Sequence, residues 1–346
     1  MNDLIRKLAN EHSLSLSEYE TLLRGQTPEN AAKLAEYAAA ERKKIYGNSV
    51  YIRGLIEISN ICRNDCYYCG IRKSNRHCHR YRLTPDEIMA CCTEGYRLGF
   101  RTFVLQGGED PYYTDKLLCK LLEDIKLCFP DCAVTLSLGE RSRESYQMLF
   151  DAGADRYLLR HETADPAHYR RLHPEPLSYE ARMQCLRDLR EIGYQVGCGF
   201  MVGSPYQTTA ELAKDLKFIE DFKPHMCGIG PFVPQKETPF GGRPAGTLGQ
   251  TTYLLSIIRL IHPGILLPST TALGTIHPEG RELGILAGAN VVMPNLSPAG
   301  VRKKYQLYDN KISDGDEAAE SIASLRARIA SIGCEIVTDR GDSKIQ

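Results

Sequence analysis

Features that would point to a charged partner or to a membrane are missing from this sequence. Lysine plus arginine and aspartate plus glutamate both total 43, so the chain has no net charge with which to attract a polyanion. Nucleic-acid binding is therefore not expected as its main role. No apolar stretch reaches the length of a membrane-spanning helix, and the N-terminus lacks the apolar core of a signal peptide. We expect a cytoplasmic protein that acts on neither membranes nor nucleic acid.

The cysteines also lack the pattern of a secreted protein. There are 13 of them, an odd number scattered over the chain, whereas a secreted disulfide framework uses an even, regularly spaced set. A reducing cytoplasm fits this usage. Three cysteines, however, are packed into one short loop with the spacing C-x3-C-x2-C, namely Cys62, Cys66 and Cys69.

This cysteine loop has no fourth cysteine. A structural zinc site needs four protein ligands, and a ferredoxin-type cluster also takes four cysteines. Three thiolates on one loop therefore suggest a [4Fe–4S] cluster in which one iron stays open to a small molecule. From the spacing alone, a disulfide or a zinc site completed by His77, Cys78 or His79 remains an alternative.

Short apolar runs alternate with amphipathic helical patterns after residue 48. Before it, the sequence predicts helices, with a capping-box pattern at residues 15–18 and an alanine-rich helix over 31–44. A further capping-box pattern at residues 84–87 starts the helix predicted over 84–98. The predicted strands are residues 50–58, 102–106, 133–138, 156–160, 195–201, 226–230, 265–271 and 290–293.

Eight strands alternating with helices predict an α/β protein with a parallel sheet. Its simplest closed form is a complete (β/α)8 barrel of the TIM type. A doubly wound open sheet is the alternative, although the glycines of residues 197–203 have the wrong spacing for its phosphate fingerprint. We expect an N-terminal helical extension (1–48), the barrel (49–312), and a C-terminal helix and tail (313–346). That tail combines a helix over 317–332, an apolar segment over 334–337 and a polar end typical of disorder.

Polar residues recur where the predicted strands end, which is where a parallel barrel builds its active site. Turn chemistry explains glycine and proline there, but it does not explain Glu162, Thr270 or Thr271. Arg156 and Arg160 lie four residues apart on the fourth strand, so alternation places them on one face. Two cations that face a barrel interior need anions, and we expect a ligand to supply them.

Several motifs together resemble one known family. The cysteine loop, with Tyr68 just before its third cysteine, resembles that of the radical S-adenosylmethionine superfamily. The combination is more specific and resembles the HydE-type [FeFe]-hydrogenase maturases, which belong to the biotin-synthase-like group. The resemblance covers residues 54–312, and its motifs are QGGED at 106–110, RHET at 160–163, GIGPF at 228–232, TTALG at 270–274 and MPN at 293–295.

The resemblance implies a radical S-adenosylmethionine enzyme. The open iron would chelate the methionine end of S-adenosylmethionine, and one electron would cleave it to a 5′-deoxyadenosyl radical. The expected role is maturation of the [FeFe]-hydrogenase H-cluster, acting on an organometallic iron–CO–cyanide–cysteine synthon. A tyrosine-lyase-type maturase would supply the synthon, and a scaffold GTPase would receive the product.

Two other functions stay open. Inside the superfamily, a methylornithine synthase or biotin synthase type of enzyme would act on a small amino-acid or thiolation substrate. Outside it, a non-catalytic cluster or zinc protein would serve as a scaffold or electron carrier, because a metal site alone does not define function.

The resemblance also implies roles for single residues. Cys62, Cys66 and Cys69 would be the catalytic, metal-binding set. Glu162 would hold the methionine end or ribose of S-adenosylmethionine, and Arg182 would pair with its carboxylate; without the resemblance, Arg182 reads as a solvated helix charge. The expected S-adenosylmethionine contacts are Tyr68, Gln106, Ser137, Glu162 and Arg182, and the expected substrate contacts are Arg53, Arg156, Arg160, Thr270, Thr271, Met293, Tyr305 and Tyr308.

One departure from the family pattern concerns a second cluster. Some members carry three further cysteines near the C-terminus that bind it. Here only Cys334 follows Cys227, so we expect a single cluster.

Overall fold

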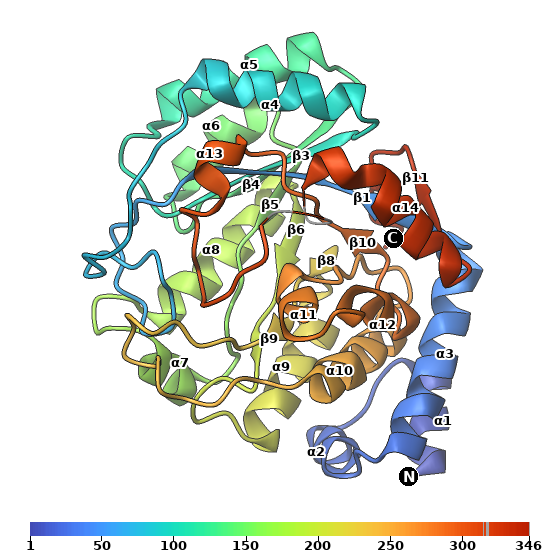
Figure 1. Cartoon of the computed structure of the whole chain (residues 1–346). Helices are drawn as coiled ribbons and strands as arrows, with labels where there is room; N and C mark the ends of the chain where they lie inside the picture. Colours follow the sequence, from blue (N-terminus) through green and yellow to red (C-terminus); the bar gives the residue numbers. More distant parts are fainter. Residues whose placement is uncertain (314, 316–317, 346) are drawn as a thin grey trace.

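A computed structural model describes residues 1–313, 315 and 318–345 of the chain (Figure 1). Its largest sheet has six strands, all parallel. They pair in the order in which they follow one another along the chain, except that β7 (Met201–Val202) belongs to a different sheet. Each strand is followed by a helical crossover, as parallel pairing requires. The six strands are β2 (Gly54–Ser59), β3 (Thr102–Gly107), β4 (Ala133–Ser137), β5 (Arg156–Leu158), β6 (Gln195–Cys198) and β8 (Met226–Cys227).

Two smaller parallel sheets complete the pairing. In the first, β1 (Ser49–Ile52) lies between β10 (Val291–Val292) and β11 (Glu335–Val337). In the second, β7 (Met201–Val202) pairs with β9 (Gly230–Pro231). The predicted first strand is thus divided into β1 and β2, with Arg53 between them.

The predicted seventh strand, residues 265–271, is not a regular strand. Leu266 forms a single bridge to Met226, and Pro268 forms one to Val291. Proline has no backbone N–H to donate, which limits regular pairing at this position. The prediction of eight regular strands is therefore wrong for this segment.

Helices cover the outside of the main sheet, and the helix after Thr84 begins where the sequence predicted. Both capping boxes form, because Ser15 and Thr84 accept hydrogen bonds from the backbones of Glu18 and Glu87, whose side chains bond back. The helices after β2 are α4 (Pro85–Arg97), α5 (Asp115–Cys128), α6 (Arg143–Asp151), α7 (Pro166–Leu172), α8 (Tyr179–Ile192), α9 (Thr209–Phe222), α10 (Leu248–Ile261), α11 (Thr271–Ile276), α12 (Gly280–Leu286), α13 (Ala299–Arg302) and α14 (Ile322–Ser331). None of the helices in the described ranges is both long and apolar enough to cross a membrane.

Three helices precede the sheet and pack on its outer helices. They are α1 (Asn2–Glu11), α2 (Leu16–Arg24) and α3 (Pro28–Tyr46), and they lie against α9 and α10 (Figure 1). The hydroxyls of Tyr19 and Ser13 donate to Glu220 of α9, at 2.6 and 2.7 Å. The N-terminal extension is therefore fixed to α9 and α10 by polar as well as apolar contacts.

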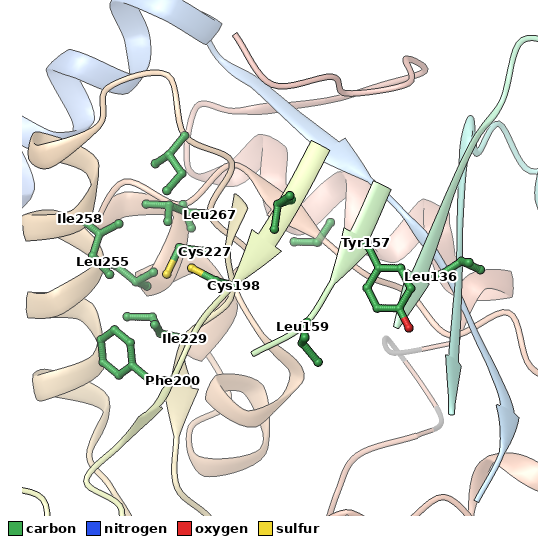
Figure 2. Packing of buried hydrophobic residues seen from close by; sticks show 14 of the residues in the cluster. Leu136, Tyr157, Leu159, Cys198, Phe200, Cys227, Ile229, Leu255, Ile258 and Leu267 are labelled. Carbon is green, nitrogen blue, oxygen red and sulfur yellow. The ribbon is translucent and has the colours of Figure 1, made fainter. Parts of the chain in front are cut away.

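The core between the sheet and α10 includes two of the scattered cysteines. Cys198 and Cys227 lie on neighbouring strands and point toward Leu255 and Ile258 of α10 (Figure 2). Both cysteines are fully buried, and burial raises the pKa of the Cys198 thiol well above its usual range. They act as small apolar packing residues.

The polar C-terminal end is ordered, contrary to the expectation from sequence. Arg340 forms an ion pair with Asp155 at 3.0 Å, and the side chain of Asp342 pairs with that of Arg156. The Thr102 hydroxyl donates to the Arg340 carbonyl at 2.7 Å. The tail thus covers the amino ends of β3, β5 and β6. The helix expected from Glu317 has its start outside the described residues, and α14 begins at Ile322.

Candidate active site

The three cysteines of the loop follow β2, at the carboxyl end of the main sheet. All three are partly exposed. Burial raises the pKa of each thiol, to about 12 for Cys66, and the charges of neighbouring cysteines raise the pKa of Cys66 and Cys69 further. The guanidinium of Arg182 lowers the pKa of Cys66. Thiolates here need positive charge beside them, and an iron centre would supply it.

A single arginine and a glycine fix the path of the cysteine loop. The guanidinium of Arg80 donates to four backbone carbonyls around the loop. A Cβ at Gly108 would lie 2.2 Å from the carbonyl oxygen of Ile61, so only glycine lets the QGGED segment pass this closely. Sequence reasoning missed Arg80, which reads as one charge among many in a basic stretch. The four carbonyls belong to Asn60, Ile71, Arg72 and Asn75, at 2.5 to 3.1 Å.

The geometry gives no support to a closed single-metal site. Within the described ranges, no three histidine, cysteine or acidic side chains converge closely enough to hold one metal ion. His77 and His79 are exposed, and Cys78 receives a hydrogen bond from the Asn60 amide at 3.5 Å.

Glu162 lies just beyond β5 with a strained backbone and an unsatisfied carboxylate. Its φ is 65°, a region that bulky residues rarely adopt, and its N–H donates to the Gly199 carbonyl at 3.0 Å. Its Oε2 is buried without a hydrogen bond, although Arg160 lies 3.2 Å away in poor alignment. Strain and a buried acceptor without a hydrogen bond together indicate a ligand site.

Arg182 is a buried residue of α8 that faces the cysteine loop. Its Nε donates to Glu140 Oε1 and its terminal nitrogen donates to the Arg160 carbonyl, both at 2.6 Å. The side chain is 8% exposed. A solvated helix charge would be exposed and mobile, so that interpretation of Arg182 is wrong.

The other expected cofactor contacts lie at the same level of the sheet. Gln106 on β3 is aligned with Glu57 on β2 and with Ser137 on β4. The Gln106 amide lies 3.5 Å from the Tyr305 hydroxyl. The Tyr68 hydroxyl is 3.1 Å from His173 Nε2. These side chains come from separate strands and loops, and the parallel register brings them to one end of the sheet.

The expected substrate contacts divide between two ends of the fold. Arg53 and Arg156 lie by the C-terminal tail, where Arg53 donates to the Gly341 carbonyl at 3.3 Å. Met293 packs in the apolar cluster of Met226 and Val291. The expectation that both strand arginines need an anion from a ligand is wrong for Arg156, because Asp342 supplies one. Arg160 lies by Glu162 beyond the other end of β5, and Tyr305 lies by Gln106 of β3. Thr270 and Thr271 lie at the start of α11, and Tyr308 follows α13.

Sequence reasoning missed a buried ion pair beside this site. Lys311 Nζ lies 2.7 Å from Glu57 Oε1, and the Asn295 amide donates to Glu57 Oε2 at 2.9 Å. The Lys311 ammonium also lies 5.4 Å from the centre of the Tyr305 ring. An acidic residue inside an apolar strand is the signal that could have revealed it, because a buried carboxylate needs a partner.

Comparisons with known proteins agree with this site. A model of the Radical SAM superfamily matches residues 56–219. The chain is 44% identical over 303 residues to the [FeFe] hydrogenase maturase subunit HydE of Thermotoga maritima, covering 88% of this chain and 86% of that protein. This chain belongs to the HydE family. It is accordingly a radical S-adenosylmethionine enzyme.

The fold of this chain is similar to that of two solved structures. The crystal structure of methylornithine synthase has a TM-score of 0.84 and 27% identity, covering 96% of this chain and 97% of that one. The structure of HydG from Carboxydothermus hydrogenoformans has a TM-score of 0.78 and 20% identity, covering 96% of this chain and 78% of that one, which shows the fold alone. The prediction of an α/β fold with a parallel sheet is confirmed.

Proposed function

We propose that this chain acts in maturation of the [FeFe]-hydrogenase H-cluster, on an iron–CO–cyanide–cysteine synthon destined for the diiron subcluster. The observation that carries the proposal is the 44% identity to a HydE maturase over 88% of the chain. The proposed partners are a tyrosine-lyase-type maturase that supplies the synthon and a scaffold GTPase that receives the product.

The cysteine loop is the proposed seat of one [4Fe–4S] cluster. Cys62, Cys66 and Cys69 would each hold one iron, and their partly exposed thiols with raised pKa suit a site whose own metal stabilises the thiolates. When bound, the cluster supplies the electron that cleaves S-adenosylmethionine to a 5′-deoxyadenosyl radical. Cys334 is buried and receives a hydrogen bond from Arg42 at 3.3 Å, which supports a packing role and a single cluster.

Glu162 and Arg182 are proposed to orient S-adenosylmethionine. Oε2 of Glu162, which is buried without a hydrogen bond, would accept one from the amino group or ribose of S-adenosylmethionine, which would satisfy an acceptor that is otherwise buried at a cost. Arg182 keeps a positive charge beside Cys66 and is held in place by Glu140. Tyr68, Gln106 and Ser137 would complete the lining of the same end of the sheet.

The substrate is proposed to lie deeper, beyond the cysteine loop. Arg160 Nε and Thr270 Oγ1 are both buried without a hydrogen-bond partner. An anionic iron complex that carries cyanide and a carboxylate offers acceptors for such groups. The proposed contacts also include Thr271, Met293, Tyr305 and Tyr308, with Arg53 and Arg156 at the far end.

A closed eight-stranded barrel would give this substrate an internal cavity. Single bridges support closure, because Met226 pairs with Leu266, Pro268 pairs with Val291, and Leu55 pairs with Asn295. These bridges join β8 to residues 266–268, those residues to β10, and the segment after β10 to β2. We propose residues 49–312 as the barrel, 1–48 as the N-terminal extension and 313–346 as the C-terminal part.

A second candidate comes from the likeness to methylornithine synthase. That structure covers 96% of this chain at a TM-score of 0.84, and its name denotes a small amino-acid product. Such an enzyme would share the radical chemistry and differ in the contacts of Arg160 and Thr270. Consumption of an amino acid without any iron synthon would favour it.

Anaerobic reconstitution with iron and sulfide tests the proposed function. After reduction by dithionite, electron paramagnetic resonance is recorded with and without S-adenosylmethionine, and 5′-deoxyadenosine is assayed. We expect a [4Fe–4S]+ signal that shifts on addition, and product formation that Cys66→Ala abolishes. Cys128→Ala is the matched control, because Cys128 is exposed and far from the loop in sequence. A signal indifferent to S-adenosylmethionine would return the chain to a scaffold role.

A further inference from the structure

An exposed tyrosine is held between two arginines on the surface beside the cysteine loop. Tyr206 is 44% exposed, and the guanidinium carbons of Arg171 and Arg243 lie 5.1 and 5.0 Å from the centre of its ring. Arg243 also donates to the Tyr206 hydroxyl at 2.7 Å. In the described part of the chain, neither guanidinium is ion-paired with a carboxylate. Tyrosine and arginine are enriched at the energetic centres of protein interfaces.

The backbone keeps Tyr206 exposed at an energetic cost. Its φ is 68°, in a region that bulky side chains rarely adopt. Gln207 holds this turn, because its amide accepts from the Gly203 N–H at 2.7 Å and donates to the Met201 carbonyl at 2.8 Å. A strained residue that presents an aromatic ring to solvent indicates a role beyond folding.

Two aromatic contacts connect Tyr206 with the cysteine loop. The Phe240 ring lies 6.2 Å from that of Tyr206 and 6.0 Å from that of Tyr67, which directly follows Cys66. The loop between β9 and α10, which contains Phe240, passes beside α7 (Figure 1). Arg171, Tyr206 and Arg243 therefore form a surface, named here the arginine–tyrosine surface, that is one aromatic layer away from the loop.

We propose that the arginine–tyrosine surface docks an acidic one-electron carrier protein. The inference rests on the proposed function, because only a cluster-bearing enzyme needs an electron from outside. In the transfer, the carrier loses one electron and the cluster gains it, and no atom moves between them.

Charge and position favour this partner. The whole chain has equal numbers of acidic and basic residues, 43 of each. The arginine–tyrosine surface, in contrast, is flanked by a third exposed arginine, Arg170, and the exposed acids that follow it in the sequence are Glu175 and Glu180. Complementary charge steers association and selects the partner, so a locally cationic surface suits an acidic carrier.

Binding of an oxidised acidic flavodoxin tests the surface without any turnover. Isothermal titration calorimetry would compare the reconstituted parent with Arg171→Glu/Arg243→Glu. The matched control is Arg6→Glu/Arg187→Glu, which makes the same charge change at exposed arginines of α1 and α8. We expect Kd to rise about tenfold or more in the first variant, with a weaker dependence on salt, and to stay unchanged in the control. Equal affinity in all three proteins overturns the proposal.

Formation of 5′-deoxyadenosine separates this inference from the proposed function. With dithionite, all three proteins are expected to react at the same rate, because a small reductant needs no docking surface. With reduced flavodoxin at low salt, Arg171→Glu/Arg243→Glu is expected to be about tenfold slower. A parent that makes no product with dithionite refutes the proposed function. A double variant that matches the parent with flavodoxin refutes the docking surface alone.

Discussion

Replacement of Lys311 by methionine would test the buried ion pair beside the site. Lys311 Nζ lies 2.7 Å from Glu57 Oε1, and the two side chains are 6% and 0% exposed. Methionine keeps most of the volume and removes the charge, so the Asn295 amide becomes the remaining hydrogen-bond donor to the Glu57 carboxylate. Burial already raises the pKa of Glu57, and loss of the ammonium will raise it further.

The size of the effect follows from the linkage of protonation to folding. Glu57 has a pKa of 4.5 in the unfolded chain and a higher pKa in the folded protein. Its contribution to the free energy of unfolding is therefore complete below pH 4.5, and it is lost as the pH rises toward the folded pKa. At about 1.4 kcal/mol per pH unit, the loss between pH 4.5 and 7 reaches at most about 3.4 kcal/mol. The range for breaking a buried pair, about 3–5 kcal/mol, is similar.

Urea unfolding followed by circular dichroism at pH 5 and pH 7 measures this effect. The free-energy deficit of Lys311→Met relative to the parent should grow between these values by up to about 2.7 kcal/mol. Glu57→Gln/Lys311→Met lacks the ionisable carboxyl, so its own free energy of unfolding should lose the pH dependence that Glu57 contributes. Lys120→Met breaks only the exposed pair with Asp124 and should cost less than about 1 kcal/mol. A Lys311→Met deficit of equal size at both pH values would refute the reasoning.

Three further predictions concern the tail, the cofactor contacts and the cluster. Although burial acts in the opposite direction, Arg156 and Arg340 lower the pKa of Asp342 to about 2, from 3.8. Asp342→Asn should therefore be less stable than the parent above pH 4, and the difference should vanish as pH falls toward 2 in an unfolding titration. Arg182→Lys should weaken S-adenosylmethionine binding at least about tenfold without changing the iron content, as measured by spectroscopic titration. The reason is that lysine cannot donate to both Glu140 and the Arg160 carbonyl as the guanidinium does. Iron analysis after reconstitution should give about four irons per chain, and about eight would contradict a single cluster.

Local patterns in the sequence were sufficient to predict several helices and strands and to locate the cysteine loop. The capping boxes at Ser15 and Thr84 formed because their partners lie three residues away. Alternating apolar runs located β2, β3 and β4, since side-chain direction follows from backbone geometry alone. The spacing of Cys62, Cys66 and Cys69 placed three thiols on one loop for the same local reason.

Tertiary structure alone decided how distant polar groups are paired. Asp342 neutralises Arg156 across 186 residues of sequence, and Lys311 neutralises Glu57 across 254. No periodicity encodes such pairs, because each depends on where the ends of separate strands and the returning tail meet in space. The strained backbone of Glu162 has the same origin, because its N–H donates to the carbonyl of Gly199, a residue distant in sequence that lies between β6 and β7.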